Sequence, residues 1–298
     1  MPHDWLASVE ASPVLECWSG WVPLDGAGDD RQVPALPGLY RIRRTSGAPG
    51  LDYIGQTGRQ LRGRLGQLTG VYRTQMPYRD PHTAAPALWA LRHRDGCEFE
   101  VSVVEVQGLP PWRKALEATA ITLYRLGAGR SPTVNFGRMP TGYRMSSGNN
   151  ARLVASGRRA RGGLDLGVPA MAASAPVAGR PGLDPQSADW MNWAWKPWTS
   201  ASVACRVAKC TGLYRIRSNE AAGLIYVGLG RVAARLRSHL AKARKPGHRQ
   251  AEYFSGELAA SWVELPGMPT LNLLEHENDL IAAHVLAKGY APAAQFLG

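Results

Sequence analysis

Short hydrophobic segments alternate with turn-forming residues along the first half of the chain, and their spacing predicts both strands and helices. Segments 39–43 and 52–54 are rich in β-branched and aromatic residues and are separated by the sequence Ser-Gly-Ala-Pro-Gly, which predicts a β-hairpin. Leu61, Leu65 and Leu68 then recur at the spacing of one helix face. The next expected elements are a helix, a strand and a helix, over 84–94, 99–106 and 111–126.

The second half of the chain repeats the landmarks of the first half in the same order. The hexapeptide Gly-Leu-Tyr-Arg-Ile-Arg begins at Gly38 and again at Gly212, 174 residues later. A tripeptide that starts with tyrosine and ends with glycine follows at Tyr53 and at Tyr226, 173 residues apart. A Val-Glu pair followed by Gly and Pro also occurs twice. Chance does not easily place so many landmarks in one order, so we expect a tandem duplication.

The duplication predicts two domains and a connector. We expect a first domain over 1–137, a basic connector over 138–185 and a second domain over 186–298. Both domains are assigned to the α+β class of mixed α/β folds. Each is expected to contain a three-stranded antiparallel sheet flanked by helices.

The chain is strongly basic, and its arginines are concentrated in the connector. There are 35 Lys and Arg against 23 Asp and Glu, a formal net charge of +12. Between Arg138 and Arg180 lie seven arginines and one acid, in a segment rich in Gly, Ala, Ser and Pro. Because the arginine fork suits phosphate, this density favours nucleic acid as the partner over another anionic surface. A basic linker that is merely solvated is the alternative.

The chain lacks the patterns of a membrane or zinc protein. It has no run of about 18 apolar residues and no signal-like start, so we expect a soluble, cytoplasmic protein without a membrane partner. Its four cysteines form no CxxC pair and have no histidine at the spacing of zinc ligands, which argues against a zinc site.

Five polar residues at the landmarks of the first domain suit hydrolysis of a phosphodiester. A hairpin can place two tyrosines side by side, with a helical Arg and a helical Glu directed at the same spot. A carboxylate can hold a divalent metal ion, and an Arg can bind the non-bridging phosphate oxygens. A Tyr whose pKa is lowered by neighbouring cations can accept the proton of an attacking water. These residues are Tyr40, Tyr53, Arg64, Glu117 and Asn135.

This ordered set resembles the GIY-YIG nuclease family, and both halves of the chain carry it. The second copy has Tyr214, Tyr226, Arg235 and Glu277 in the same order. The resemblance covers most of the chain, apart from the connector and part of the tryptophan-rich segments. It implies an endonuclease domain that depends on Mg²⁺ or Mn²⁺, with one ion at each active site.

The resemblance also implies a role for each residue. In the first copy, Tyr40 is the expected general base and Tyr53 lies close beside it. Arg64 is expected to bind the scissile phosphate. Glu117 is the expected metal ligand, and Asn135 a structural polar contact near the site. The corresponding residues of the second copy take the same roles, with Glu277 as the metal ligand.

Alignment of the two copies identifies the phosphate-binding arginine. Arg64 aligns with Arg235, whereas Arg62 aligns with an alanine. Arg59 and Arg62 are therefore interpreted as contacts to the nucleic-acid backbone or as solvated charges. Further nucleic-acid contacts are expected from arginines of the connector and of the second copy: Arg158, Arg159, Arg161, Arg231 and Arg237.

The alignment also selects the acid of the second copy. Glu117 precedes Asn135 by 18 residues, and Glu277 precedes Gln295 by the same 18. Glu275 does not fit this spacing. The glutamine side chain is one methylene longer than that of asparagine, so its amide need not make the same contact. The second copy is therefore the less complete site, and its activity stays open.

His239 follows Arg235 by four residues, on the same face of the expected helix, where the first copy has Leu68. Some members of the family carry a histidine at this place. His239 is therefore either a second proton carrier or phosphate contact, or a surface histidine near the end of a helix.

Seven of the ten tryptophans lie in the segments that lead into the two copies. The favoured interpretation is that they pack against the domains, because aromatic side chains bury large areas. The alternative is a stacking surface for an unstacked base. These residues are Trp5, Trp18, Trp21, Trp190, Trp193, Trp195 and Trp198.

The sequence thus predicts a metal-dependent DNA endonuclease that acts in restriction or defence. Cutting both strands of a duplex requires two sites of opposed polarity, which the tandem domains of a monomer could supply as a pseudo-dimer. Duplex DNA is the favoured substrate, and RNA is not excluded. Two alternatives stay open: one active domain beside a domain that only grips DNA, in repair or structure-specific cleavage, or a nucleic-acid-binding module without catalysis.

Overall fold

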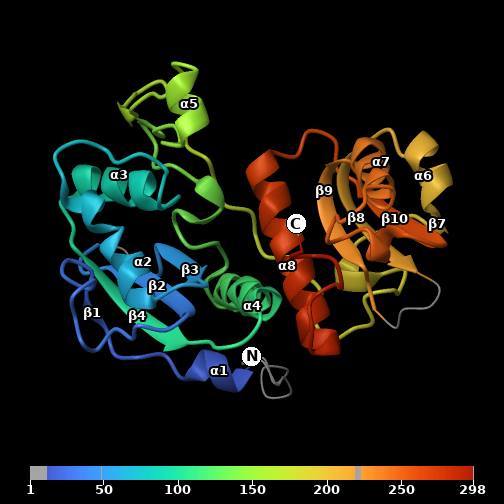
Figure 1. Ribbon diagram of the computed structural model, residues 1–298, viewed down its shortest axis with the longest axis horizontal. Helices are drawn as coiled ribbons and strands as arrows, with labels where there is room; N and C mark the ends of the chain where they lie inside the picture. Colours follow the sequence, from blue (N-terminus) through green and yellow to red (C-terminus); the bar gives the residue numbers. More distant parts are fainter. Residues whose placement is uncertain (1–11, 48, 219–222, 298) are drawn as a thin grey trace. The chain divides into compact units, whose positions relative to one another are not determined.

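The computed structural model describes residues 12–47, 49–218 and 223–297. Two compact bodies are present, and each is considered by itself. The N-terminal body comprises Val14–Gly108 and Arg130–Ala173, and the C-terminal body is formed mainly by Leu109–Gly129 and the described part of Ser174–Gly298. Each body contains an antiparallel sheet flanked by helices, so the expected α+β class is confirmed (Figure 1). The domain boundaries drawn from the repeat stay a prediction.

A four-stranded antiparallel sheet, in the order β1-β4-β2-β3, lies in the N-terminal body. It contains the three expected strands and a two-residue strand at one edge: β2 (Gly38–Arg44), β3 (Tyr53–Thr57), β4 (Phe99–Glu105) and β1 (Val22–Pro23). Tyr40 and Ile42 of β2 are buried in the core on one face of this sheet. The accompanying helical segments are α1 (Ser12–Glu16), α2 (Leu61–Gly66), η2 (Thr69–Tyr72), α3 (Ala85–Asp95) and η3 (Asn135–Gly137).

Helix α2 is shorter than its leucine spacing predicts. It ends at Gly66, and Leu68 lies beyond it at the start of the 3-10 turn η2, although all three leucines are fully buried. Gly63 and Gly66 account for the early end, because glycine costs about 1 kcal/mol relative to alanine inside a helix. Leu68 therefore does not share a helix with Arg64.

The C-terminal body is built on a second four-stranded sheet, in the order β7-β10-β8-β9. Figure 1 shows this sheet between α8 and the pair α6 and α7. The strands are β7 (Thr199–Ser200), β8 (Thr211–Ser218), β9 (Tyr226–Arg231) and β10 (Leu258–Glu264). The helical segments are α4 (Pro110–Ala128), η4 (Trp190–Asn192), α6 (Ala201–Val207), α7 (Val232–Lys242), η5 (Glu252–Phe254) and α8 (Thr270–Lys288).

Helices α4 and α8 are joined by a buried ion cluster. Arg125 of α4 is fully buried, and its Nη1 lies 3.2 Å from Glu275 Oε1. Its Nε lies 2.9 Å from Asp279 Oδ1. The two carboxylates also accept backbone N–H groups of Ser174 and Val177 at 2.7 and 3.0 Å. Glu275 therefore belongs to the packing of the helices, in agreement with its exclusion as the acid of the site.

The first part of the predicted connector is folded onto the N-terminal body. Strands β5 (Tyr143–Arg144) and β6 (Gly163–Leu164) pair, and helix α5 (Ala151–Ala155) lies between them in the chain. The Asn149 N–H donates to Asp80 at 2.6 Å. Residues 138–173 therefore contain paired strands and a contact with the N-terminal body, while most residues of 151–161 are exposed.

The tryptophans of both copies cover arginines of the repeated hexapeptide. The Arg41 guanidinium lies 4.7 Å from the ring centroid of Trp18. Its counterpart Arg215 lies 4.3 and 4.6 Å from the rings of Trp195 and Trp198. Such cation–π contacts, strongest when desolvated, account for an arginine at this strand position, which is half-buried at Arg41 and buried at Arg215. Trp18, Trp195 and Trp198 therefore pack on the sheets as favoured; Trp5 lies outside the described residues.

Arg41 and Arg215 also make the same hydrogen bonds to a serine of the neighbouring strand. Arg41 Nε donates to Ser102 Oγ at 3.2 Å, and that hydroxyl donates to a backbone carbonyl at 2.8 Å. Arg215 Nε likewise donates to Ser261 Oγ at 3.3 Å, whose hydroxyl donates to a carbonyl at 2.7 Å. The similarity of the two copies therefore extends to side-chain contacts.

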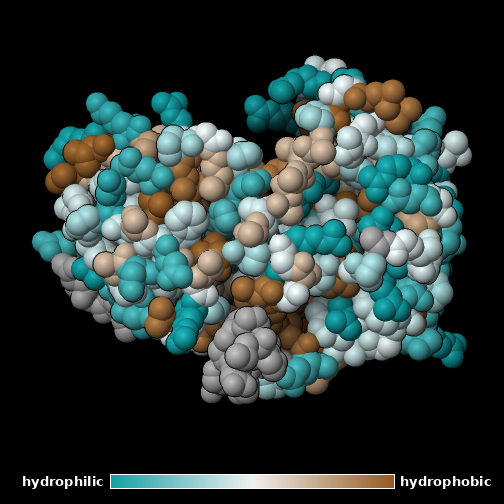
Figure 2. Space-filling view, turned by 180° about the vertical axis from the view of Figure 1, so that it is seen from behind, coloured by the Kyte–Doolittle hydropathy of each residue, from teal (hydrophilic) through white to brown (hydrophobic). Residues whose placement is uncertain are grey.

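None of the helices in the described part of the chain has the length and hydrophobicity of a membrane span. On the face seen in Figure 2, hydrophobic residues form separate groups among hydrophilic ones.

Candidate functional site

Each copy holds a pair of tyrosines beside a glycine. The ring centroids of Tyr40 and Tyr53 lie 6.0 Å apart, and those of Tyr214 and Tyr226 lie 6.2 Å apart. Tyr40 is the cross-strand partner of the glycine that ends the tyrosine tripeptide, as is Tyr214 in the second copy. The hairpin therefore brings the tyrosines together as the sequence predicts.

Steric contact explains the glycine of both tripeptides. A Cβ atom at Gly55 would lie 2.7 Å from the Tyr40 hydroxyl oxygen, and one at Gly228 would lie 2.4 Å from the Tyr214 hydroxyl oxygen. The tyrosine ring thus occupies the space that any other side chain would need. At Gly55 the Tyr53 ring also comes close, with its Cε1 atom 2.5 Å from such a Cβ, so the first copy needs the glycine for both tyrosines.

His239 reaches the first tyrosine of the second copy. Its Nε2 lies 2.8 Å from the Tyr214 hydroxyl oxygen, and its side chain is buried. A surface histidine is therefore the wrong interpretation. Burial, with smaller contributions from Lys242 and Arg235, lowers its pKa from 6.5 to about 3. The imidazole is neutral at pH 7 and can accept a hydrogen bond from the phenol.

The first copy has an equivalent histidine that the sequence alignment missed. His82, in the segment before α3, is fully buried, and its Nε2 lies 2.8 Å from the Tyr40 hydroxyl oxygen. Burial, and then the charge of Arg64, lowers its pKa well below 6.5. His82 lies before α3, whereas His239 lies on α7, so the two positions do not align in the sequence. The only sequence signal for His82 is that it is a histidine.

The two histidines differ in their second nitrogen. The Ala84 N–H donates to His82 Nδ1 at 3.2 Å. A neutral His82 therefore carries its proton on Nε2 and donates it to the Tyr40 oxygen. The Nδ1 atom of His239 is buried without a hydrogen-bond partner, so either tautomer is allowed there.

Arg235 and Glu277 complete the second site. The Arg235 guanidinium interacts with both tyrosines and opposes a rise in their pKa, but burial outweighs it. The pKa of Tyr214 and Tyr226 is therefore raised, and the expectation that cations lower it is wrong for this copy. Burial also raises the pKa of Glu277 from 4.5 to about 7, against the opposing charge of Arg235.

The first copy gathers only part of its expected set within one body. Arg64 Nη1 donates to Gln67 and to the Pro81 carbonyl at 3.0 and 2.8 Å, and its charge acts on His82. Glu117 lies half-buried on α4, which groups with the C-terminal body. Its place beside Tyr40 therefore stays a prediction.

Asn135 and Gln295 make the same contact with the second strand. Asn135 Oδ1 accepts the Ile54 N–H at 2.9 Å, and its Nδ2 donates to the Ile54 carbonyl at 2.8 Å. Gln295 Oε1 accepts the Val227 N–H at 2.9 Å. The longer glutamine side chain therefore still accepts a backbone N–H of the second strand, as Asn135 does.

Glu277 is the carboxylate of the second copy that could bind a divalent metal ion. Within the described ranges, no three His, Cys, Asp or Glu side chains gather as metal ligands. A single carboxylate still suits Mg²⁺, which keeps several waters and is completed by substrate phosphates. A buried carboxylate with a raised pKa also gains from a cation beside it.

The arginines expected to contact nucleic acid are mostly available at the surface. Arg62 is the exception, because its Nε and Nη2 donate to the Val33 carbonyl at 3.1 and 2.9 Å. Arg237 also donates to a carbonyl, that of Cys205, at 2.9 Å. The exposed members are Arg59, Arg158, Arg159, Arg161, Arg231 and Arg237.

Comparison of the chain with protein-family models, curated proteins and solved structures finds no match. A neutral histidine that is hydrogen-bonded to a tyrosine can take part in proton transfer, and a neighbouring arginine can bind an anion beside them.

Proposed function

We propose that the chain is a divalent-metal-dependent endonuclease that hydrolyses DNA phosphodiester bonds. The observation that carries the proposal is the repeated contact at 2.8 Å between a buried neutral histidine and the first tyrosine of each pair. The resemblance of the ordered tyrosine, arginine and glutamate set to the GIY-YIG nucleases supports it. The two copies act on duplex DNA as a pseudo-dimer within one monomer, in restriction or defence.

In the second copy, Arg235, Tyr214, His239 and Glu277 each take one role in the proposed hydrolysis. Arg235 binds the non-bridging oxygens of the phosphate. The Tyr214 oxygen takes a proton from the attacking water as its own proton passes along their hydrogen bond to His239 Nε2. Burial disfavours a phenolate and an imidazolium alike, and the negative charge of the bound phosphate offsets that cost for the imidazolium. The water oxygen bonds to phosphorus, and the bond to the departing sugar oxygen breaks. A divalent ion held by Glu277 would stabilise the charge on that oxygen.

The first copy uses its histidine differently, which favours a second candidate function. His82 donates to the Tyr40 oxygen and so stabilises negative charge there instead of accepting a proton. The two copies are therefore chemically unequal. An enzyme with one cutting copy and one copy that grips DNA is the second candidate.

Cleavage of supercoiled plasmid tests the proposal. With Mg²⁺ or Mn²⁺ the wild type should linearise the plasmid, and Glu117→Gln or Glu277→Gln should each leave only nicking. Glu257→Gln, at an exposed carboxyl, is the matched control and should cut as the wild type does. A double variant of Glu117 and Glu277 that cuts normally would refute the proposal.

Two further outcomes separate the alternatives. If one of the two single variants abolishes all cleavage and the other leaves it intact, the protein has one cutting copy and one copy that only grips DNA. Tight DNA binding without metal-dependent cleavage of any DNA or RNA would instead indicate a binding module.

A further inference from the structure

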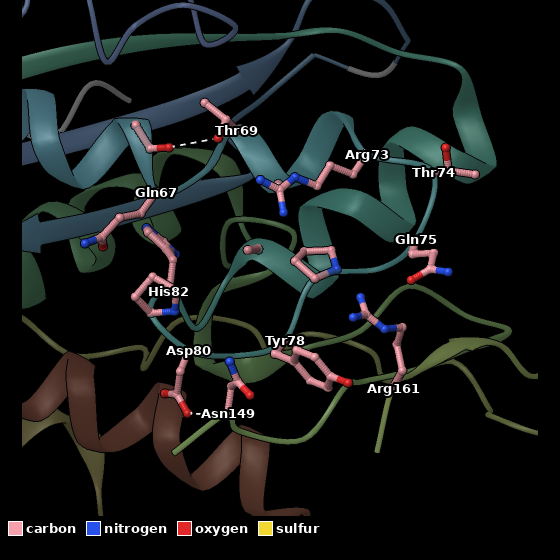
Figure 3. A pocket seen from close by; sticks show the side chains of 15 residues that line it. Gln67, Thr69, Arg73, Thr74, Gln75, Tyr78, Asp80, His82, Asn149 and Arg161 are labelled. Atoms are coloured by element: carbon pink, nitrogen blue, oxygen red, sulfur yellow. Dashed lines mark hydrogen bonds between the residues drawn. The ribbon is translucent and has the colours of Figure 1, made fainter. Parts of the chain in front are cut away.

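A pocket of about 700 Å³ opens beside His82 in the N-terminal body (Figure 3). Its walls come from the segment between α2 and α3 and from Asn149 and Arg161 of the folded connector. Small-molecule pockets span about 300–1,000 Å³, so this pocket has room for a nucleotide. Neither the tyrosine pair nor the proposed metal ligand uses it.

The aromatic ring of Tyr78 holds Arg161 at this pocket and packs against the neighbouring Arg159, which lies outside the lining. Figure 3 shows Arg161 beside Tyr78, whose ring centroid lies 4.4 Å from the Arg161 guanidinium and 4.7 Å from that of Arg159. Arg161 Nη1 also donates to the Met76 carbonyl at 2.7 Å. Arg73 adds a further cation to the lining. Such held guanidinium groups suit the phosphates of a nucleic-acid backbone.

Amides and a carboxylate supply the polar lining. Gln75 and Asn149 each carry an amide, which both donates and accepts hydrogen bonds. Asp80 accepts the Asn149 N–H at 2.6 Å, which ties the two walls together. Donors and acceptors of this kind match the hydrogen-bonding edges of a base.

The second copy has an aromatic side chain beside its histidine. Phe254, from the 3-10 turn η5, is buried with its ring centroid 4.6 Å from that of His239. It also packs against Tyr226, with ring centroids 6.1 Å apart. Polar groups therefore line the pocket beside His82, whereas a buried phenylalanine packs beside His239.

We propose that the pocket beside His82 binds one unpaired nucleotide of a DNA substrate, with the base inside and the flanking phosphates on Arg73 and Arg161. The inference rests on the proposed function, since it assumes that DNA is bound at the neighbouring Tyr40. Taking a base out of the stack costs least where the nucleotide is already unpaired. The protein should therefore prefer DNA that contains a bulged nucleotide.

Fluorescence anisotropy on the full chain in EDTA tests this preference without cleavage. The probes are two labelled duplexes of equal length, one fully paired and one with a single-nucleotide bulge. The wild type should bind the bulged duplex about tenfold more tightly. Gln75→Trp, at an exposed residue of the lining, should fill the pocket and bring the two affinities together. Gln32→Trp, at an exposed residue outside the lining, should keep the preference.

The affinity for the fully paired duplex serves as the check that Gln75→Trp is folded. Equal binding of both duplexes by the wild type, or a bulge preference that survives Gln75→Trp, overturns the assignment of the pocket. A wild type that cuts plasmid but binds both duplexes equally refutes the pocket alone. A wild type that prefers the bulge but never cuts DNA refutes the nuclease and leaves the pocket standing.

Discussion

Replacement of Glu277 by glutamine should stabilise the protein at alkaline pH while it removes the proposed metal ligand. Burial raises the pKa of this carboxyl from 4.5 to about 7. A difference of about 2.5 between these pKa values corresponds to about 3 kcal/mol, at about 1.36 kcal/mol for each pKa unit. Because the side chain is partly exposed and water screens its charge, we expect about 2 kcal/mol.

The sign follows from which state binds the proton more tightly. Below pH 4.5 both the folded protein and the unfolded chain hold the Glu277 proton, and the charge has no effect on stability. As the pH rises from 4.5 to 7, the unfolded chain loses its proton first, so the free energy of unfolding falls. Above pH 7 the folded protein carries the whole of the roughly 2 kcal/mol cost of ionising this partly exposed carboxyl.

Urea unfolding in EDTA at pH 4.5 and pH 8.5, followed by tryptophan fluorescence, measures the effect. Glu277→Gln should come within about 0.5 kcal/mol of the wild type at the lower pH, where the carboxyl of the unfolded chain is half ionised, and should exceed it by about 2 kcal/mol at the higher pH. Glu257→Gln, at an exposed carboxyl, is the matched control and should show no such gain. A gain that is equal at both pH values, or a loss at pH 8.5, would refute the reasoning.

A divalent ion should narrow the difference between the wild type and Glu277→Gln at pH 8.5. If Glu277 holds the ion, Mn²⁺ should raise the unfolding midpoint of the wild type and leave that of Glu277→Gln unchanged, because a ligand that binds only the folded state stabilises it.

Two further substitutions test the packing that positions the second site. Arg125→Met should lower the free energy of unfolding by about 3–5 kcal/mol in urea, because it leaves Glu275 and Asp279 buried without a cation; a loss below about 1 kcal/mol would contradict the ion cluster. Gly228→Ala should cost about 1–3 kcal/mol in the same assay, because the new methyl group overlaps the Tyr214 ring; wild-type stability would show that the ring has room to move.

The strands and the tyrosine pairs could be predicted because their information is local. The alternation in the hexapeptide places Tyr40 and Arg41 on opposite faces, and the short turn before Tyr53 fixes the antiparallel partner. The two-residue strands at the sheet edges were missed, because a pair such as Val22–Pro23 carries no alternation that could be recognised.

His82 could not be predicted, because its position depends on where a helix ends. The alignment placed Leu68 opposite His239, as though the two first helices had equal length. Gly63 and Gly66 end α2 early, whereas α7 continues to Lys242 and carries His239 on its buried side. The first copy therefore supplies its imidazole from a later segment.

This difference in origin bears on why the histidines are there. If the imidazole only filled space in the core, a residue such as Leu68 would serve, and nothing would set the position of one ring nitrogen. Yet both copies place Nε2 2.8 Å from the hydroxyl oxygen of the first tyrosine, from a helix in one copy and from a segment outside any helix in the other. A contact that is reached by two routes points to a requirement of the tyrosine itself. That requirement is for a proton donor or acceptor at its oxygen, which is the property that the proposed hydrolysis needs.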